Sequence, residues 1–240
     1  MRHSHSHSGS PSGLRALSLA AAVGATAAAA APTARAEPHD EVSLGGAARA
    51  LRSPSANAIT GADLAGISLG LARELGHDLG VDHSSWPVPS LALWAEAGLV
   101  ATSATGAMFK SLSTEIDQLG VTGGVAVRYR VHRLVTAGAR FAVGAQRARL
   151  AITDHTTTAY DHAWGAMASA GAAIDVFAVS LPRFGLGVRA EAGYVAAQGI
   201  ALTPHTDRSD DTVALTMASA AIGHLDLSGP SVALSVLGQF

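Results

Sequence analysis

The sequence predicts an all-β protein, a closed antiparallel transmembrane β-barrel of about eight strands connected as an up-and-down meander. One basis is a two-residue alternation of apolar with polar or small residues through most of the chain after residue 60. Another is length, because the alternating stretches exceed the ~5–6 residues of ordinary strands and reach the ~9–11 that a tilted membrane-crossing strand needs. The third is that only 14% of the residues are charged, against about 25% in soluble domains.

The N-terminal residues have the three parts of a secretory signal peptide. Arg2 and Arg15 supply positive charge, residues 16–31 form an apolar run, and Ala34 and Ala36 frame a small-residue cleavage site. We therefore expect residues 1–36 to be removed. The alternative is an uncleaved anchor helix, for which the alanine-rich run is only marginally apolar.

The remaining chain is expected to form one barrel preceded by a short segment. Residues 37–60 lack the alternation, so we expect them to form an N-terminal segment outside the barrel with one short helical turn. The barrel is assigned to residues 61–240. Its predicted strands are 64–75, 90–102, 118–131, 134–152, 163–180, 184–202, 212–227 and 231–240. Tight turns at 131–134, 180–184 and 227–231 join three pairs of strands, and longer polar loops join the others.

The face opposite the apolar residues consists mostly of Gly, Ala, Ser and Thr, which suits the narrow interior of an eight-stranded barrel. Charges of the two signs are equally represented on this face. A closed network of ion pairs requires this balance, because an unpaired buried charge costs several kcal/mol. We expect the network to lie in the lumen; the alternative is a solvated face of a soluble sheet. Its predicted members are Glu96, Arg128, Arg130, Arg140, Asp175, Arg189, Glu191 and Asp226.

Residues 163–181 allow a different interpretation, because this nearly apolar stretch is long enough for a transmembrane helix. Asp175 lies inside it and no other segment after residue 36 is similar, so a strand is preferred. The net charge of −2 without a basic stripe argues against nucleic-acid binding. The absence of Cys excludes disulfides and thiolate metal sites.

The chain ends in a strictly alternating strand, SVALSVLGQF, whose last residue is aromatic. Val232, Leu234, Val236 and Phe240 share one face, on which Gly238 also lies. With the signal peptide and the eight alternating strands, this ending resembles the small eight-stranded outer-membrane β-barrels of Gram-negative bacteria, over residues 61–240. In that family the last strand is recognised by the barrel assembly machinery, which the resemblance implies for these four residues. A bulky residue is more usual at the position of Gly238.

The resemblance implies a location in the cell outer membrane, with outer-membrane lipid and the barrel assembly machinery as partners and residues 37–60 in the periplasm. It also implies short periplasmic turns and long outer loops. With strands counted from residue 64, the tight turns would fall on the outer side instead. Either the outer loops are trimmed, or the strand count is wrong by one near residues 50–90.

No residue pattern supports chemistry at a defined site. His and Asp gather in predicted loops, as at His77, Asp78 and His83, but their spacing matches no metal site, and no nucleophile motif is present. We therefore expect no metal, no cofactor and no catalytic residues. The predicted function is structural or surface-interacting, with a lumen plugged by its charges and an unidentified partner bound through loops. The alternatives are a narrow pore or small-solute conduit, and a lipid-modifying enzyme of the outer membrane.

Overall fold

The computed structural model describes residues 40–61, 63–76, 91–108, 112–132, 134–154, 157–181, 184–205 and 223–240. The signal peptide predicted for residues 1–36 lies outside these residues. The barrel strands are β1 (Asp40–Arg49), β2 (Leu64–Gly76), β3 (Leu91–Met108), β4 (Leu112–His132), β5 (Val135–Asp154), β6 (Thr157–Leu181), β7 (Phe184–Ala197) and β10 (Gly229–Gln239). The other elements are a helix, α2 (Pro54–Thr60), and a two-stranded sheet of β8 (Ile200–Ala201) and β9 (His224–Leu225).

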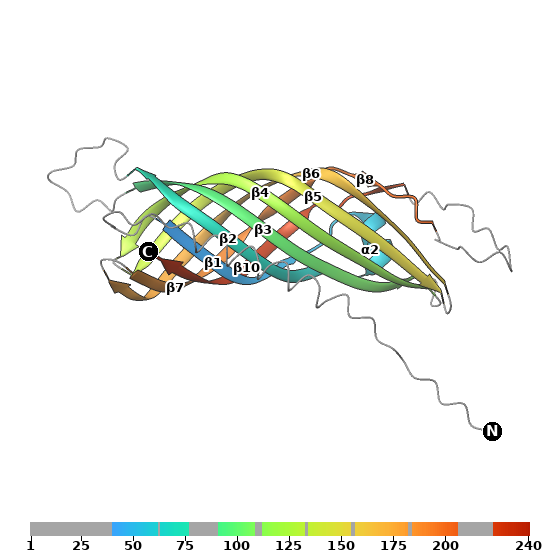
Figure 1. Cartoon of the computed structure of the whole chain (residues 1–240), viewed down its shortest axis with the longest axis horizontal. Helices are drawn as coiled ribbons and strands as arrows, with labels where there is room; N and C mark the ends of the chain where they lie inside the picture. Colours follow the sequence, from blue (N-terminus) through green and yellow to red (C-terminus); the bar gives the residue numbers. More distant parts are fainter. Residues whose placement is uncertain are drawn as a thin grey trace, which may run out of the picture. The chain divides into compact units, whose positions relative to one another are not determined.

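The eight barrel strands form one closed antiparallel ring, in the order β1-β10-β7-β6-β5-β4-β3-β2 (Figure 1). The ring closes at β1, which pairs along its whole length with β10 on one side and with β2 on the other. Every strand therefore has two partners, and no row of backbone donors and acceptors is left at an open edge. The predicted fold, an eight-stranded antiparallel meander closed into a barrel, is confirmed.

The first strand of the barrel was missed in the sequence. Residues 40–49 form β1 and do not lie in a segment outside the barrel, so the barrel begins at Asp40 rather than at residue 61. The outward positions of this strand include Gly46 and Ala48, which weaken the apolar alternation. Pairing with β10 and β2 nevertheless extends the segment, since each of these strands would otherwise have a free edge.

The described part of the strand predicted at 212–227, residues 223–227, is not part of the ring. Residues 212–222 lie outside the described residues, and His224–Leu225 pair with Ile200–Ala201 in the small sheet. One strand was missed at residues 40–49 and one was predicted in excess at residues 212–227, so the predicted number of eight strands is correct. The partner of the last strand, however, differs from the one expected. The C-terminal strand closes on β1 and not on the strand that begins at Leu64.

Asp40 and the C-terminal Phe240 lie at the same end of the barrel, which we call the terminal end. Their backbone amides and carbonyls are hydrogen-bonded in both directions, at 3.1 and 3.0 Å. At this end β4–β5 and β6–β7 are joined by two residues each and β2–β3 by 14 residues, and α2 lies at the opposite end (Figure 1). Counting from β1 moves the β4–β5 and β6–β7 connections to the terminal end, as expected, but the 14-residue connection between β2 and β3 also falls there. At the opposite end, β3–β4 and β5–β6 are joined by only three and two residues.

Beyond an ion pair between Asp40 and Arg73 at the terminal rim, the outer face of the wall is apolar as far as Ala101, Leu119, Ala145 and Trp164, and we call this surface the belt. On β5 the belt runs from Val135 to Ala145, about 23 Å at ~3.3 Å per residue and a tilt of ~45°. This height is close to the ~25 Å apolar band of a membrane barrel. Exposed members of the belt include Leu44, Val121, Val127, Phe141, Ile174, Val188 and Leu234.

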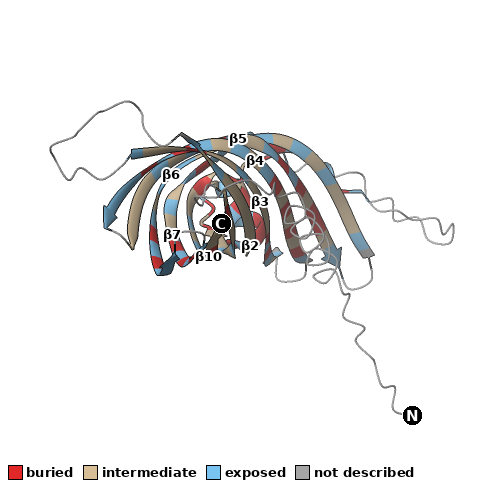
Figure 2. Ribbon diagram, turned by 60° about the vertical axis from the view of Figure 1, so that its left-hand side comes forward, coloured by how far each residue is buried: buried red, intermediate tan, exposed pale blue. Residues whose placement is uncertain are grey.

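Exposed and buried residues alternate along the strands of the wall, as the bands along β7 in Figure 2 show. The segment for which a transmembrane helix was the alternative, residues 163–181, belongs to strand β6. Among the residues that the structure describes, no helix has the length and apolarity to cross a membrane.

Strands β3–β6 continue past the belt, and we call this continuation the crown (residues 102–108, 112–118, 146–154 and 157–163). Its inward side chains form a hydrophobic cluster with α2 and the segments around β8 and β9. The buried members are Leu51, Ala56, Ile59, Leu64, Ala104, Ile116, Ala148, Leu150, Ile200, Leu202, Leu225 and Leu227. The crown thus has an interior like that of a small soluble protein.

Helix α2 has clear boundaries in the sequence. Pro54 lies in its first turn, where a missing N–H costs nothing. Gly61 ends it in the left-handed conformation, with φ 59°, and donates its N–H to Asn57 O at 2.9 Å. The helix packs tightly on β3 because residue 106 is glycine: a Cβ there would overlap the backbone of Thr60.

Candidate functional site

A network of ion pairs crosses the lumen in the half nearest the terminal end, centred on Arg128 of β4. Its Nη1 and Nη2 donate to the two carboxylate oxygens of Glu41 at 2.7 and 3.1 Å. Nη2 also donates to Glu96 Oε1 at 2.8 Å. The Trp94 ring centroid lies 4.2 Å from the guanidinium carbon, within the range of a cation–π contact. Arg128 therefore links β4 to its neighbour β3 and, across the lumen, to β1.

Arg189 of β7 makes the second fork of the network. Its Nε and Nη2 donate to the two oxygens of Asp175 at 2.6 and 2.8 Å, and Nη2 lies 2.8 Å from Glu41 Oε1. Gln239 of β10 donates to the other oxygen of Glu41, Oε2, at 3.1 Å. Glu41 is thus shared by two guanidiniums and an amide, and is almost completely buried.

Arg140 of β5 forms the edge of the network. Its Nη1 donates to Glu191 Oε2 at 2.5 Å, and its Nε lies 3.2 Å from Glu96 Oε2. With this residue the network ties together seven of the eight barrel strands, all except β2. Charge-assisted and bidentate hydrogen bonds of this kind are the strong ones, and the low dielectric of a dry lumen strengthens them further.

The structure brings together six of the eight residues predicted for the lumen charges: Glu96, Arg128, Arg140, Asp175, Arg189 and Glu191. The other two do not join them. Arg130 lies farther along β4 toward the turn and is exposed. Asp226 lies after β9, where its carboxylate accepts the backbone N–H of Ser228 at 2.8 Å, because the strand that was to carry it into the lumen is not part of the ring.

Two members of the network were missed in the sequence, Glu41 and Gln239. Glu41 was missed because its strand was assigned to a segment outside the barrel. Its signal was present, since Glu41, Ser43 and Gly45 alternate with Val42 and Leu44. Gln239 lies on the parity opposite Val232, Leu234 and Val236, which is the inward face, but its partner could not be named without β1.

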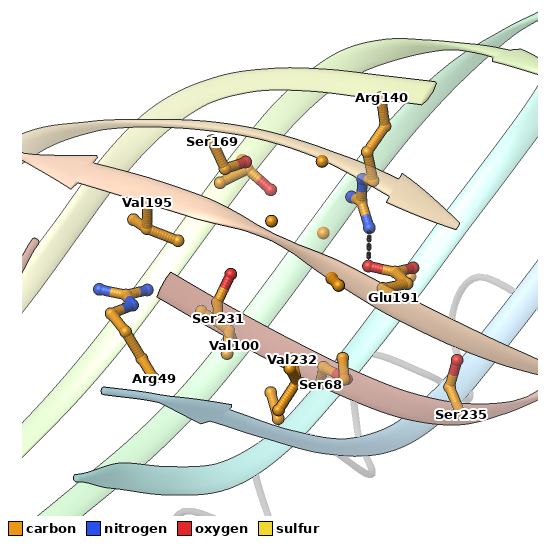
Figure 3. Close-up of a pocket in the computed structure, with 18 of the residues that line it drawn as sticks. Arg49, Ser68, Val100, Arg140, Ser169, Glu191, Val195, Ser231, Val232 and Ser235 are labelled. Atoms are coloured by element: carbon orange, nitrogen blue, oxygen red, sulfur yellow. Dashed lines mark hydrogen bonds and ion pairs between the residues drawn. The ribbon is translucent and has the colours of Figure 1, made fainter. Parts of the chain in front are cut away.

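A cavity of about 150 Å³ lies in the lumen between the network and the crown interior. Arg140 and Glu191 line one end of it and Arg49 the other, as Figure 3 shows. Small and hydroxyl-bearing side chains line the rest, among them Ser169 and Ser231.

The crown reverses the polarity of the wall without changing the alternation. On β5 the outward residues Phe141 and Val143 belong to the belt, whereas Arg147 and Arg149 follow them in the crown. Inward, the completely buried Leu150 replaces the polar residues of the lower lumen. A wall that is apolar outside and polar inside thus becomes polar outside and apolar inside.

Polar contacts on the outside of the crown are of the surface type. Arg149 Nη1 lies 3.5 Å from Asp117 Oδ2 on the neighbouring strand, with both side chains about two-fifths exposed. The guanidinium of Arg149 also lies 5.6 Å from the Tyr160 ring centroid. Near the tip of the crown, the hydroxyls of Thr153 on β5 and Thr158 on β6 form a hydrogen bond of 3.0 Å.

The residues predicted as the assembly signal lie on the outer face of β10. Val232, Leu234, Val236 and Phe240 are all exposed, whereas Ser235 on the other face is buried.

In the part of the chain that the structure describes, no group of three or more His, Cys, Asp or Glu is arranged to hold a metal ion. The predicted loop with His77, Asp78 and His83 lies outside the described residues.

No protein-family model matches the chain, and no curated protein matches it in sequence. Among solved structures it is similar to Ail, the attachment invasion locus protein of Yersinia pestis, with 13% identity and a TM-score of 0.45, over 85% of this chain and 100% of that one. It is also similar to the translocator domain of the autotransporter NalP from Neisseria meningitidis, with 9% identity and a TM-score of 0.39, over 94% and 96%. The transport unit of AIDA-I from Escherichia coli follows with 8% identity and a TM-score of 0.35, over 88% and 92%. Since each TM-score lies below 0.5, the fold assignment rests on the strand pairing of this chain itself.

Proposed function

We propose that this chain is an outer-membrane β-barrel protein of structural or surface-interacting type, with a plugged lumen, that holds the crown outside the lipid. The observation that supports this most directly is the reversal of wall polarity along β3–β6. A lipid-facing wall must be apolar and its backbone closed into a ring. A water-facing wall must place its apolar side chains inside.

The lumen is proposed to be plugged by two different fillings. The ion-pair network fills the half nearest the terminal end, and the crown cluster with α2 fills the other. An eight-stranded barrel has an interior just wide enough for side chains to fill. Together the two fillings support a role in anchoring and display rather than transport.

The proposed orientation places the terminal end in the periplasm and the crown on the cell surface. The extension of β3–β6 beyond the belt, with polar residues on its outer face, supports it, as do the two-residue β4–β5 and β6–β7 connections at the terminal end; the 14-residue β2–β3 connection at that end does not. Outer-membrane lipid would contact the belt, and the barrel assembly machinery would recognise the outward face of β10. An unidentified partner would contact the crown. The role proposed is non-enzymatic, as the sequence suggests through its lack of a nucleophile motif.

The orientation can be tested with single cysteines, because the chain contains none. Thr105→Cys lies on the exposed outer side of the crown, and Ser180→Cys lies exposed at the terminal end. In intact cells, a maleimide that cannot cross the outer membrane should label the cysteine at position 105 and not the one at position 180. After the membrane is broken, it should label the cysteine at either position. The opposite labelling, or recovery of the protein in the soluble periplasmic fraction without a heat-dependent gel shift, would overturn the proposal.

A narrow conduit for small solutes is the second candidate, favoured by the cavity of about 150 Å³ in the lumen. Conduction would require both fillings to open. In planar bilayers we expect no steady conductance from the wild type. A steady conductance that changes when Arg128 or Glu191 is replaced would favour the conduit over the plugged barrel.

A further inference from the structure

Arg49, the last residue of β1, is a buried cation without a partner of opposite charge among the described residues. The residue is 5% exposed. Its Nη1 donates to the backbone oxygen of Leu227 at 3.2 Å, while its Nε has no hydrogen-bond partner. A guanidinium carries five N–H donors, and a buried charge left unpaired costs several kcal/mol. The group therefore calls for an acceptor that the described residues do not supply.

The charges of the lumen show where that acceptor would lie. The network holds four carboxylates, of Glu41, Glu96, Asp175 and Glu191, against three guanidiniums, of Arg128, Arg140 and Arg189. It therefore carries one surplus negative charge, whereas Arg49 carries one positive charge at the other end of the cavity (Figure 3). No ion pair joins Arg49 to the network in the described residues, so the cavity separates the two signs.

The cavity has the room and the hydrogen-bond donors to hold a small anion beside Arg49. Its volume of about 150 Å³ is roughly ten times the ~10–15 Å³ needed for a single water. Ser231 pairs directly with Arg49 in the strand register, and its hydroxyl lines the same cavity. Ser169 adds a further hydroxyl, whereas the hydroxyl of Thr102 already donates to Gln118 Oε1 at 3.2 Å.

We propose that Arg49 and the hydroxyls around it form a binding site for a small monovalent anion, of carboxylate type, inside the lumen. The fork of a guanidinium matches the two oxygens of a carboxylate. The surplus negative charge of the network at the far end of the cavity disfavours a divalent anion, because like charges repel strongly where water is scarce. The site thus selects by charge as well as by size.

The test is equilibrium dialysis of the full-length folded protein in detergent with radiolabelled acetate. The supporting salt has a sulfonate anion too bulky for the cavity, and a heat-dependent gel shift verifies that each variant is folded. Arg49→Gln removes the cation with little change in volume. Arg147→Gln is the matched control, because it removes the same charge from the exposed outer face of the crown.

We expect one saturable acetate site per barrel in the wild type and in R147Q, and an affinity lower by at least about tenfold in R49Q, equivalent to ~1.4 kcal/mol. Sulfate should compete at least about tenfold more weakly than acetate. Absence of saturable binding by the folded wild type would overturn the proposal, whether or not R49Q folds. So would equal binding by R49Q, or tighter binding of sulfate.

Discussion

The belt and the crown are built from the same strands, yet they are stabilised in opposite ways. In the belt the charges lie inside, where they are paired in a space from which side chains exclude water, and the apolar residues face outward. In the crown the interior is mainly apolar, with the buried side chains of Thr102, Gln118 and Gln146 hydrogen-bonded to one another next to the belt, and the charges lie outside. The strand period and register continue unchanged between the two, so the surroundings outside the wall determine which face is apolar.

The largest effect is expected inside the belt, at the centre of the ion-pair network. Arg128→Met leaves Glu41 and Glu96 buried with fewer partners, so the free energy of unfolding should fall by about 3–5 kcal/mol. Urea unfolding in lipid vesicles measures it. Arg147→Met removes an arginine from the exposed face of the crown and should cost less than ~0.5 kcal/mol. A loss at Arg128 no larger than the loss at Arg147 would contradict the distinction between the two regions.

Inside the crown, apolar packing should carry the stability. Leu150 is completely buried in the cluster beneath α2, so Leu150→Ala should destabilise the barrel by about 2–5 kcal/mol. The same urea titration applies. Ser103→Ala, at an exposed outward position of the crown, serves as the control and should change little. If Leu150→Ala were neutral, the crown interior could not be a packed core.

A new charge on the outer wall should be costly in the belt and harmless in the crown. Ala139 lies on the outward face of β5 in the belt. If the belt faces hydrocarbon, as proposed, an arginine there should cost about 2–4 kcal/mol. Thr105→Arg places the same charge on the exposed outside of the crown. The folded fraction in vesicles, measured by the heat-dependent gel shift, compares the two. Equal tolerance at both positions would show that the belt does not face lipid.

The smallest effect is expected for the ion pair between Arg149 and Asp117 on the outside of the crown. Because both side chains are about two-fifths exposed, a double-mutant cycle should give a coupling of only ~0.2–1 kcal/mol. The coupling should decrease further in high salt, whereas the coupling between Arg128 and Glu41 should hardly change. If the coupling between Arg149 and Asp117 did not depend on salt, the two side chains would have to be less exposed to solvent than they are in the structure.

Most of the wall could be predicted from the sequence because its alternation is local. β5 was recognised within two residues at each end, whereas the predicted start of β6 was six residues too late and the predicted end of β7 five residues too late. The outward faces of these strands were assigned correctly. The crown portions of β3 and β4, and residues 157–162 of β6, were instead interpreted as loop. Outward Glu115 and Asp117 break the apolar pattern in β4, although the inward Ile116 continues the alternation on the other face.

The polarity reversal was also present in the sequence. Along β5 the larger apolar residues stand at odd positions through Val143 and at even positions from Leu150 onward. What a sequence could not provide is the partner of each charge. Glu41 and Arg128 are 87 positions apart, and their contact depends on how the ring closes and how wide the lumen is. Arg49 could not be identified as unpaired before those partners were known.

The continuity of β5 and β6 has a mechanical consequence. Their pairing runs from Val135–Val176 near the terminal end to Asp154–Thr157 at the tip of the crown without a register shift. Tension applied along the strands at the tip would act on these hydrogen bonds in shear, so that many of them would share the force at the same time instead of breaking one after another. The crown would then be mechanically stiff. A force applied to it by a bound partner would be transmitted along β5 and β6 to the ion-pair network, with no flexible linker in between.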